Sequence, residues 1–403
     1  MRFFRWNVLF ALLMGLLVFA GCSSGDSAGD NPDDIYSAKI QSVVSDSWNS
    51  YKAGYPGIQG GLAVRVLSDR GDYYAGADMP VSTNENTHFR AASITKTFTS
   101  AAIMLLQQRG LLNIDDKITG NIPGKSEPYL PDTSDYNIPY KSEITIKQLL
   151  QHRAGVFDVA NDNIPEDSNV PYAGQNYLVY VLKQDPYHTF DVDELAGVVA
   201  VNGLYAGTPG EKFSYSDTGY SLLGRIIERV SGMSYGDFVT SNLLETNNLN
   251  NSTLPWKGTD QTIPSPFITG YDYNTLVPDL FLTNNISFQV ANGNIISTTQ
   301  DLSVWAEKLY TGKAGLRQEY VNMITDTLPV TDTFSYGLGC YYIEGLGYGH
   351  SGGISGYLSF MIYDPQTNLS MTILSNVMNW DDSANQQLLL MNTMKKIKEV
   401  MEE

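Results

Sequence analysis

The sequence predicts an α/β protein of the α+β type, with one antiparallel sheet built from both chain ends and flanked by helices. Strand-like segments lie near the N-terminal end and again after residue 336, the stretch between them is rich in loops with scattered helices, and no internal repeat is present. Because a sheet buries at least one face against another layer, both sets of strands are expected to share one sheet, with a mostly helical region inserted between them.

The composition suits a well-packed protein of one or two domains. Of the 403 residues, 42% are hydrophobic and 17% are charged, which is typical of a globular chain rather than a disordered one. The order of the strands favours one folded domain over 36–403. Its sheet region is expected at about 36–110 and 293–403, and its helical region at about 111–292.

The elements follow from local patterns. A helix is expected over 35–51, and a hairpin follows it because Ser-Asp-Arg-Gly at 68–71 is typical of a turn. The helix over 297–309 opens with Ser-Thr-Thr and has Asp301 in its first turn, as helix starts often do. The other helices are expected at 146–155, 218–230 and 383–400, and the strands at 59–67, 72–75, 337–342, 356–363 and 369–375.

The first residues form a targeting segment. Arg2 and Arg5 precede an apolar run over 8–20, which is shorter than the roughly 20 residues that a membrane span needs. The run ends in Phe-Ala-Gly-Cys and resembles a bacterial lipoprotein signal peptide over 1–22, with Cys22 lipidated. Residues 23–35 are then a flexible tether, and the protein is expected outside the cytoplasm, anchored to the membrane of the cell envelope. The alternatives are an ordinary signal peptide cut nearby and an uncleaved anchor.

Charge and cysteine content exclude several classes of function. The formal charge is −18 and no basic patch is present, so nucleic acid is not an expected partner. Cys22 and Cys340 are the two cysteines, so a lipidated Cys22 leaves no disulfide framework. Cys340 lies in a strand-like stretch and is expected in the core.

Ser93 and Lys96 form a Ser-x-x-Lys sequence at the start of an expected apolar helix that ends near Gly110. Residues three apart share a helix face, so the hydroxyl and the amine would be neighbours. A Lys buried there without a carboxylate partner would have a lowered pKa, and its neutral amine could activate the hydroxyl. The helix N-terminus adds N–H groups where an oxyanion would form. The alternative is a surface helix with an ordinary Lys, because so short a motif often occurs by chance.

Tyr215 lies between a Pro-Gly turn at 209–210 and the helix over 218–230. A Tyr on such a rigid loop can face a cleft. Near a charged Lys96 its phenol pKa would fall, and the phenolate would be a competent base. The alternative is that Tyr215 is one of 26 tyrosines and that Asp217 simply caps the next helix.

Residues 349–353 read Gly-His-Ser-Gly-Gly, which has the spacing of the nucleophile elbow in α/β-hydrolases. That assignment fails because the elbow fold needs a His after the Ser, and no His follows His350. The glycines suit an edge strand that lies against a substrate, with the Gly353 N–H available for an oxyanion hole. The four His are far apart in the sequence, so neither a metal site nor another cofactor is expected.

Taken in this order, the three segments resemble the serine penicillin-recognising family: DD-carboxypeptidases of low molecular weight, class C β-lactamases and related esterases. Ser93 and Lys96 match its Ser-x-x-Lys, residues 215–217 its Tyr-x-Asn, and residues 350–352 its Lys/His-x-Gly. The resemblance covers roughly 36–403 and implies a β-lactamase/transpeptidase-like fold. Stretches at 149–155, 293–302 and 336–339 also fit the secreted carboxypeptidase branch. The resemblance implies catalytic roles for Ser93, Lys96 and Tyr215 and substrate contacts from Asp217, His350, Ser351, Gly352 and Gly353.

Asp217 departs from the family pattern, in which Asn is usual. An ionised carboxylate cannot donate to a substrate carbonyl as an amide does. Asp217 could instead hold Lys96 charged, which would shift the role of base to Tyr215. Residues 216–218 also approximate the Ser-Asp-Asn of class A β-lactamases, but the nearest match to the class A Glu segment, at 245–250, is one residue too long.

The second departure concerns charge. No Lys or Arg lies between Arg317 and Lys395. The strand that would face a peptide carboxylate therefore has only His350, which is largely neutral near pH 7. This weakens the assignment as a carboxypeptidase relative to an assignment as an esterase or amide hydrolase.

The sequence therefore predicts a serine hydrolase that forms an acyl-enzyme, most simply a D-alanyl-D-alanine carboxypeptidase-like peptidase acting on cell-wall-type peptides. Ser93 would attack, Lys96 and Tyr215 would share proton transfer, and the N–H groups of Ser93 and Gly353 would stabilise the oxyanion. The expected partners are a small peptide, ester or β-lactam and, through the lipid, a membrane. The alternatives are an esterase or β-lactamase of the same family and a non-catalytic, penicillin-recognising sensor lipoprotein.

Overall fold

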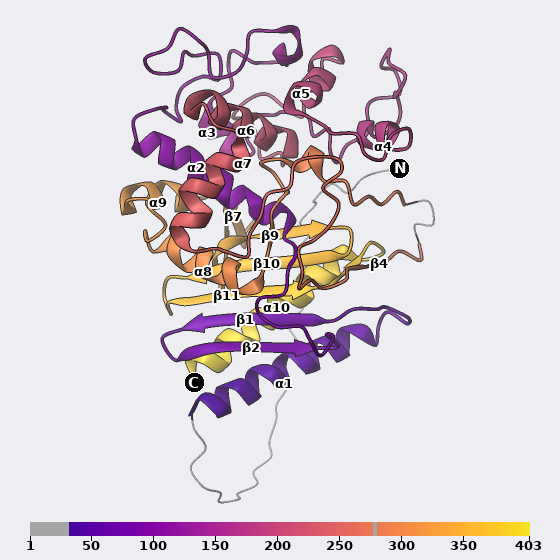
Figure 1. The fold of residues 1–403 in the computed structure, drawn as a ribbon, viewed down its shortest axis with the longest axis vertical. Coiled ribbons are helices and arrows are strands. Elements are labelled where there is room, and N and C mark those ends of the chain that lie inside the picture. Colours follow the sequence, from indigo (N-terminus) through magenta and orange to yellow (C-terminus); the bar gives the residue numbers. More distant parts are fainter. Residues whose placement is uncertain (1–31, 277–279) are drawn as a thin grey trace, which may run out of the picture.

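A computed structural model describes residues 32–276 and 280–403, and its central feature is an eight-stranded sheet (Figure 1). The strands follow the order β2-β1-β11-β10-β9-β8-β7-β6, and each neighbouring pair is antiparallel. Strands from the two chain ends meet where β1 pairs with β11, with Val64 opposite Ile373. The strands span Leu62–Ser68 (β1), Gly71–Ala77 (β2), Leu328–Pro329 (β6), Phe334–Tyr336 (β7), Tyr341–Ile343 (β8), Gly347–Ile354 (β9), Tyr357–Asp364 (β10) and Leu369–Ser375 (β11).

Helices cover both faces of this sheet. α1 packs on β2 and on α10, whereas α8 packs on β11, β10 and β1 from the other face (Figure 1). Because both faces are covered, the central strands β10 and β11 are buried along their whole length, including the polar Ser370 and Thr372 of β11, which form hydrogen bonds with Ser303 of α8. The helices are Pro32–Lys52 (α1), Thr95–Gln108 (α2), Ile146–Leu150 (α3), Tyr177–Leu182 (α4), Val192–Val201 (α5), Asp217–Ser231 (α6), Tyr235–Val239 (α7), Thr299–Tyr310 (α8), Gln318–Thr325 (α9) and Ser383–Glu402 (α10).

Two apolar cores result from this layering. One lies between the sheet and the pair α1 and α10, and it contains Trp48. The other joins α8 and the sheet to the inserted helical region, where the rings of Phe98 and Trp305 stack with centroids 4.2 Å apart. α2 runs through this second core, and Lys96 is the buried ionisable residue of its first turn.

Two short sheets complete the fold, and one of them lies beside the start of α2. β3 (Phe89–Arg90) pairs with β5 (Ile296–Ser297), and β4 (Tyr271–Tyr273) pairs with β12 (Val377–Asn379). The β3–β5 pair holds the segment before Ser93 beside the segment after Asn292, although the two are far apart in the sequence.

The predicted fold class is confirmed, with differences at particular elements. The predicted strand over 337–342 is wrong at 337–340, where the chain turns between β7 and β8, and right at 341–342, which open β8. Gly339 has φ +71°, and an added Cβ there would lie 2.8 Å from the backbone oxygen of Lys96, so this turn packs closely on α2. Cys340 is buried at the turn, as expected of a core residue.

The N-terminal predictions fall mostly outside the described residues. The signal peptide over 1–22 and the lipidated Cys22 lie there, as does most of the tether over 23–35. α1 begins at Pro32, within the segment predicted as a tether. In the described part of the chain, no helix is both long enough and apolar enough to cross a bilayer.

Candidate active site

Ser93 lies in a short 3-10 turn, Ala92–Ile94, which leads directly into α2. The backbone N–H of Ala91 donates to the oxygen of Ile295 at 3.0 Å and fixes the approach to this turn. Ala92 has φ +47°, a left-handed conformation that is costly for a residue with a Cβ and is often found at functional sites. This bend places Ser93, which is half-buried, at the N-terminal end of α2.

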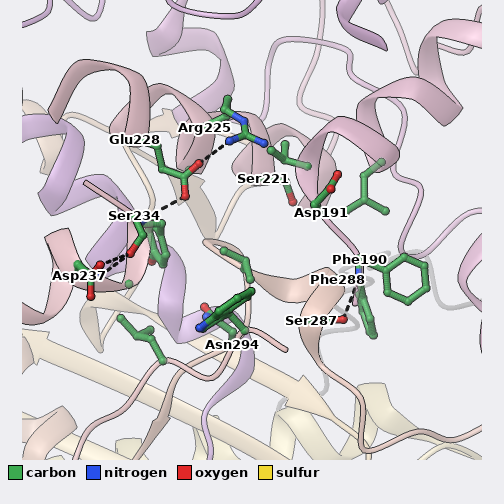
Figure 2. A pocket seen from close by; sticks show the side chains of 18 of the residues that line it. Phe190, Asp191, Ser221, Arg225, Glu228, Ser234, Asp237, Ser287, Phe288 and Asn294 are labelled. Carbon is green, nitrogen blue, oxygen red and sulfur yellow. Dashed lines mark hydrogen bonds and ion pairs between the residues drawn. The ribbon is translucent and has the colours of Figure 1, made fainter. Parts of the chain in front are cut away.

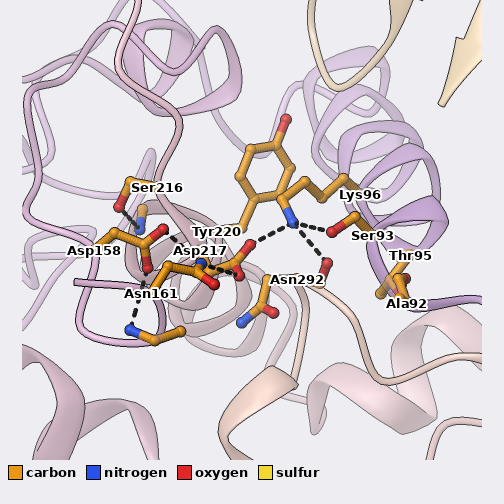
Figure 3. A network of polar contacts seen from close by, with 12 residues as sticks. Ala92, Ser93, Thr95, Lys96, Asp158, Asn161, Ser216, Asp217, Tyr220 and Asn292 are labelled. Atoms are coloured by element: carbon orange, nitrogen blue, oxygen red, sulfur yellow. Dashed lines mark hydrogen bonds and ion pairs between the residues drawn. The ribbon is translucent and has the colours of Figure 1, made fainter. Parts of the chain in front are cut away.

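Lys96 is fully buried, and its Nζ makes three hydrogen bonds (Figure 3). It donates to Ser93 Oγ at 3.1 Å, to Asp217 Oδ1 at 2.6 Å and to the backbone oxygen of Asn292 at 2.8 Å. Burial lowers the pKa of Lys96 overall, although the charge and hydrogen bond of Asp217 oppose that shift. The sequence predicts a lowered pKa for a Lys without a carboxylate partner, and it also offers Asp217 as a group that could hold Lys96 charged. The contact with Asp217 is present, and burial still lowers the pKa of Lys96.

Tyr215 is the third predicted catalytic residue, and its ring lies beside the amine of Lys96. The Nζ of Lys96 lies 4.8 Å from the centroid of its ring, and His152 stacks on the same ring with centroids 4.1 Å apart. Burial raises the pKa of Tyr215 well above 10, with a further contribution from Asp217, while a side-chain interaction with Ser93 lowers it. The predicted fall in this pKa is therefore wrong, because burial outweighs the nearby amine. The phenol is neutral near pH 7 and suits a proton donor.

His152 holds the Tyr215 loop in place. Its Nδ1 accepts a hydrogen bond from the backbone N–H of Ser216 at 3.1 Å, so the ring is neutral. Burial, followed by the charge of Lys96, lowers the pKa of His152 well below 6.5. The cap of α6 is Ser216, whose side chain accepts from Gly219 N at 3.1 Å; Asp217 is not the cap and is free to face Lys96.

A second carboxylic acid lies behind Asp217 (Figure 3). The Nδ2 of Asn161 donates to Asp158 Oδ2 at 2.8 Å and to Asp217 Oδ2 at 3.0 Å, so one amide links the two carboxyl groups. Burial, and then the charge of Asp217, raise the pKa of Asp158 to about 8. The direction of this shift favours the neutral acid at Asp158, and the charge of Asp217 is matched by that of Lys96 whenever the amine is protonated.

The glycines of β9 lie directly against the Ser93 segment. β8 pairs only with Gly347–Gly349, so the second half of β9 is an edge beside the turn that carries Ser93. A Cβ added at Gly352 would lie 2.0 Å from the backbone oxygen of Ala91, which only glycine avoids. Gly353, opposite Leu358 of β10, follows on this edge, where its N–H is available for an oxyanion hole.

The other two predicted substrate contacts are buried. The Nδ1 of His350 lies 2.6 Å from the oxygen of Ser351, and its Nε2 lies 3.1 Å from the hydroxyl of Tyr336. Burial, with help from the charge of Lys96, lowers the pKa of His350 to about 3. The ring therefore supplies no positive charge for a substrate carboxylate. Ser351 is also fully buried and shares a hydrogen bond of 2.8 Å with the hydroxyl of Tyr341.

A small hollow opens beside these groups, and we call it the substrate hollow. It has a volume of about 110 Å³ and is bordered by Asn161 and Gly353. Among the described residues that line it, none carries a charge. Its apolar walls are formed by Leu178, Val179, Leu182, Phe281, Leu282, Phe288, Ile354 and Trp380.

Sequence reasoning missed three residues of this network: Asp158, Asn161 and Asn292. Asp158 comes three residues after the motif at 149–155, and Asn292 directly precedes the motif at 293–302. This closeness to the two motifs is the sequence signal that could have pointed to Asp158 and Asn292. Within the described ranges, no group of three or more His, Cys, Asp or Glu side chains is placed to hold a metal ion.

Comparisons with known proteins match this architecture. A model of the Beta-lactamase family matches residues 55–392. Protein flp of Staphylococcus aureus (strain NCTC 8325 / PS 47) is 26% identical over 322 residues, which are 78% of this chain and 57% of that protein. Penicillin-binding protein 4* of Bacillus subtilis (strain 168) is 27% identical over 308 residues, which are 72% of this chain and 61% of that protein. The chain thus spans little more than half the length of these curated relatives.

Solved structures share the fold over most of their length. A D-stereospecific amidohydrolase from Streptomyces sp. superposes with a TM-score of 0.71 at 24% identity, covering 89% of this chain and 98% of that one. D-amino acid amidase from Ochrobactrum anthropi SV3 gives a TM-score of 0.70 at 20% identity, covering 91% and 99%. At sequence identities this low, the structural similarity shows a shared fold alone.

Proposed function

The chain belongs to the beta-lactamase family, and from that premise we propose that it is a serine hydrolase that cleaves small amides or esters through an acyl-enzyme. One observation carries the proposal: the buried amine of Lys96 is hydrogen-bonded to the Ser93 hydroxyl at 3.1 Å. A buried amine with a lowered pKa beside a hydroxyl is the arrangement that activates a serine nucleophile. A protein that only binds its ligand does not need a buried amine beside a serine hydroxyl.

The proton path follows from the contacts. Neutral Lys96 takes the proton of Ser93 as the oxygen attacks the carbonyl, and Asp217 stabilises the resulting ammonium. Tyr215, a neutral phenol, donates its proton to the leaving nitrogen or oxygen as the bond to the carbonyl carbon breaks, and Lys96 then returns a proton to it. Water cleaves the acyl-enzyme by the reverse transfers, which restores the Ser93 hydroxyl.

The oxyanion of each tetrahedral intermediate is stabilised by backbone N–H groups. Ser93 contributes one from the start of α2, and Gly353 contributes the other from the edge of β9. Such donors act in a partly dry site and need no rearrangement during the reaction, which is why they are effective.

The substrate that fits best has an apolar group near the reacting carbonyl and no carboxylate on its leaving group. The uncharged lining of the substrate hollow and the neutral His350 support this preference. The names of the two amidases of similar fold agree with an amide substrate. The second candidate is the D-alanyl-D-alanine carboxypeptidase that the sequence predicts, which the similarity to penicillin-binding protein 4* favours.

Two measurements test the proposal. After reaction with a fluorescent penicillin, intact-protein mass spectrometry should show one adduct on the native chain and none on Ser93→Ala. An adduct that persists in Ser93→Ala, or none on the native chain, would contradict it. Hydrolysis of D-phenylalanine amide, of a nitrophenyl ester and of an acyl-D-alanyl-D-alanine peptide then ranks the substrate classes, and the peptide is expected to be the poorest.

We further propose that the protein is anchored outside the cytoplasm by a lipid on Cys22, a proposal that rests on the sequence pattern of residues 1–22. Labelling of cells with a radioactive fatty acid should mark the native protein and not Cys22→Ala. Equal labelling of the two would exclude this anchor.

A further inference from the structure

A second, larger cavity is lined in part by Ser221, Arg225 and Glu228 of α6, and we call it the Arg225 cavity (Figure 2). Its volume of about 590 Å³ is within the range of small-molecule sites. The side chain of Ser221 lines it and accepts a hydrogen bond from Nδ2 of Asn292 at 3.1 Å. The backbone oxygen of the same Asn292 accepts a hydrogen bond from Nζ of Lys96. Nothing in the proposed hydrolysis uses this cavity.

Four aromatic rings line it, beside aliphatic and polar side chains. Phe190 and Phe288 meet edge to face with ring centroids 6.1 Å apart, and Tyr235 is buried at the base. Trp256 leaves 55% of its surface exposed at the rim, where the Nζ of Lys257 already lies 5.0 Å from its ring centroid. Such rings offer an apolar surface and also attract cations through their faces.

The charges of the cavity are predominantly negative. Its one cation, Arg225, is satisfied by two carboxylates, because it donates at 2.8 Å both to Asp193 and to Glu228. Asp191 and Asp237 line opposite sides (Figure 2), and no basic partner is seen for either among the described residues. In the described ranges, the Asp191 carboxylate accepts a local hydrogen bond from Glu194 N, and the Asp237 carboxylate accepts one from the Ser234 hydroxyl.

A buried acceptor points to the same kind of ligand. Asn294 lines the cavity with 1% of its surface exposed. Its Nδ2 donates to the oxygen of Pro255 at 3.0 Å, but its Oδ1 has no hydrogen-bond partner in the part of the chain that the structure describes. An unsatisfied buried carbonyl is costly, so it favours a ligand that brings a donor.

We propose that the Arg225 cavity is a second, non-catalytic binding site for a protonated amine carried on a small apolar body. The aromatic rings contact the body, Asn294 Oδ1 accepts a hydrogen bond, and the carboxylates of Asp191 and Asp237 favour the positive charge. A neutral alcohol of the same shape can still donate to Asn294 Oδ1 but lacks the positive charge, and a carboxylate lacks both the donor and the charge.

The test uses three probes of similar shape: 2-phenylethylammonium, 2-phenylethanol and phenylacetate. Isothermal titration with the full chain at pH 7 should give the ammonium a Kd of about 1 mM, which is usual for a ligand of this size. The alcohol should bind about tenfold more weakly, and phenylacetate should show no binding. Equal affinity for all three probes, or no binding of the ammonium, would overturn the proposal.

Paired variants locate the site. The double variant Asp191→Asn with Asp237→Asn keeps the local hydrogen bonds, since Asn caps a helix well at 191 and its amide oxygen can accept from the Ser234 hydroxyl at 237. It should weaken ammonium binding about tenfold. Asp332→Asn removes an exposed charge elsewhere and should change nothing. A loss in Asp217→Asn instead would place the amine in the catalytic crevice and overturn the assignment. The titration needs no turnover, so its outcome and that of the Ser93 adduct are independent.

Discussion

The Nζ of Lys96 and the carboxylate of Asp217 lie 2.6 Å apart, and the amine is completely buried. This ion pair opposes the effect of burial on the Lys96 pKa, so it sets the pH at which the amine becomes a base. The Asn that the family usually has at position 217 lacks that charge.

We therefore predict that Asp217→Asn shifts the pH dependence toward acid. Without the carboxylate, the pKa of Lys96 falls further, so the neutral amine persists to lower pH. The ascending limb of kcat/KM should move down by about one pH unit or more, the usual effect of a close charge. A pH profile with a nitrophenyl ester measures it. An unchanged or alkaline-shifted limb would mean that Lys96 is not the base.

The role of Tyr215 is tested by Tyr215→Phe, which keeps the ring stacked on His152 and removes the hydroxyl. Loss of a general acid should lower kcat for an amide by roughly 100-fold to 10,000-fold. A nitrophenolate leaves without a proton, so ester hydrolysis should fall much less. Equal losses for the two substrates would exclude proton donation to the leaving group.

The close approach of β9 to the Ser93 segment makes Gly352 sensitive to a single methyl group. Gly352→Ala would place a Cβ 2.0 Å from Ala91 O, so the strand must move and the oxyanion donor with it. Activity should fall about 100-fold, as displacements near 1 Å commonly cause. Gly236→Ala is the control: nothing lies within 4 Å of its added Cβ, and this helical site should gain about 0.5–1 kcal/mol in free energy of unfolding.

The pair of Lys398 and Asp364 ties α10 to the end of β10. Their charged atoms lie 2.7 Å apart, and the side chains are 13% and 4% exposed. Burial alone would raise the pKa of Asp364, but hydrogen bonds from Lys398, Thr367 and the backbone of Gln366 lower it overall. A depressed carboxyl pKa adds stability above the unfolded value near 3.9 and loses it as the pH falls through the folded value.

Lys398→Met should therefore lower the free energy of unfolding by about 1–3 kcal/mol at pH 7, since a buried charge loses its partner. The difference from the native chain should shrink as the pH falls below about 4, the unfolded value, and through the lower folded pKa of Asp364. Urea unfolding at both pH values measures this. The exposed neighbour Lys396→Met should have little effect, and a loss for Lys398→Met that is equal at both pH values would contradict the ion-pair explanation.

The sequence predicted the fold class well because alternation and periodicity are local signals. The hairpin of β1 and β2 and the helices α6, α8 and α10 follow from such patterns. The turn at 337–340 was read as a strand because its residues resemble a buried strand, whereas its shape is set by packing against α2. Tertiary contact of this kind leaves no trace in the local pattern.

The candidate site was predictable only where a motif marks a side chain. Ser93, Lys96 and Tyr215 stand in recognisable segments, and the structure brings them together. The backbone oxygen of Asn292 and the amide of Asn161 act from loops, where no spacing rule applies. The pKa of Tyr215 also required the structure, because its direction depends on how much water the loop excludes.

The pairing of β1 with β11 brings residues 64 and 373 into register, and it has a consequence for how the chain folds. The hairpin at the start of the domain packs on α1 but has no neighbouring strand in the sheet until nearly the whole polypeptide has been synthesised. Contacts of such long sequence separation slow the search for the native state. A ribosome-bound chain that stops before β11 would therefore contain Ser93 and α2 but not the complete eight-stranded sheet. Activity should appear only after the C-terminal segment has been synthesised.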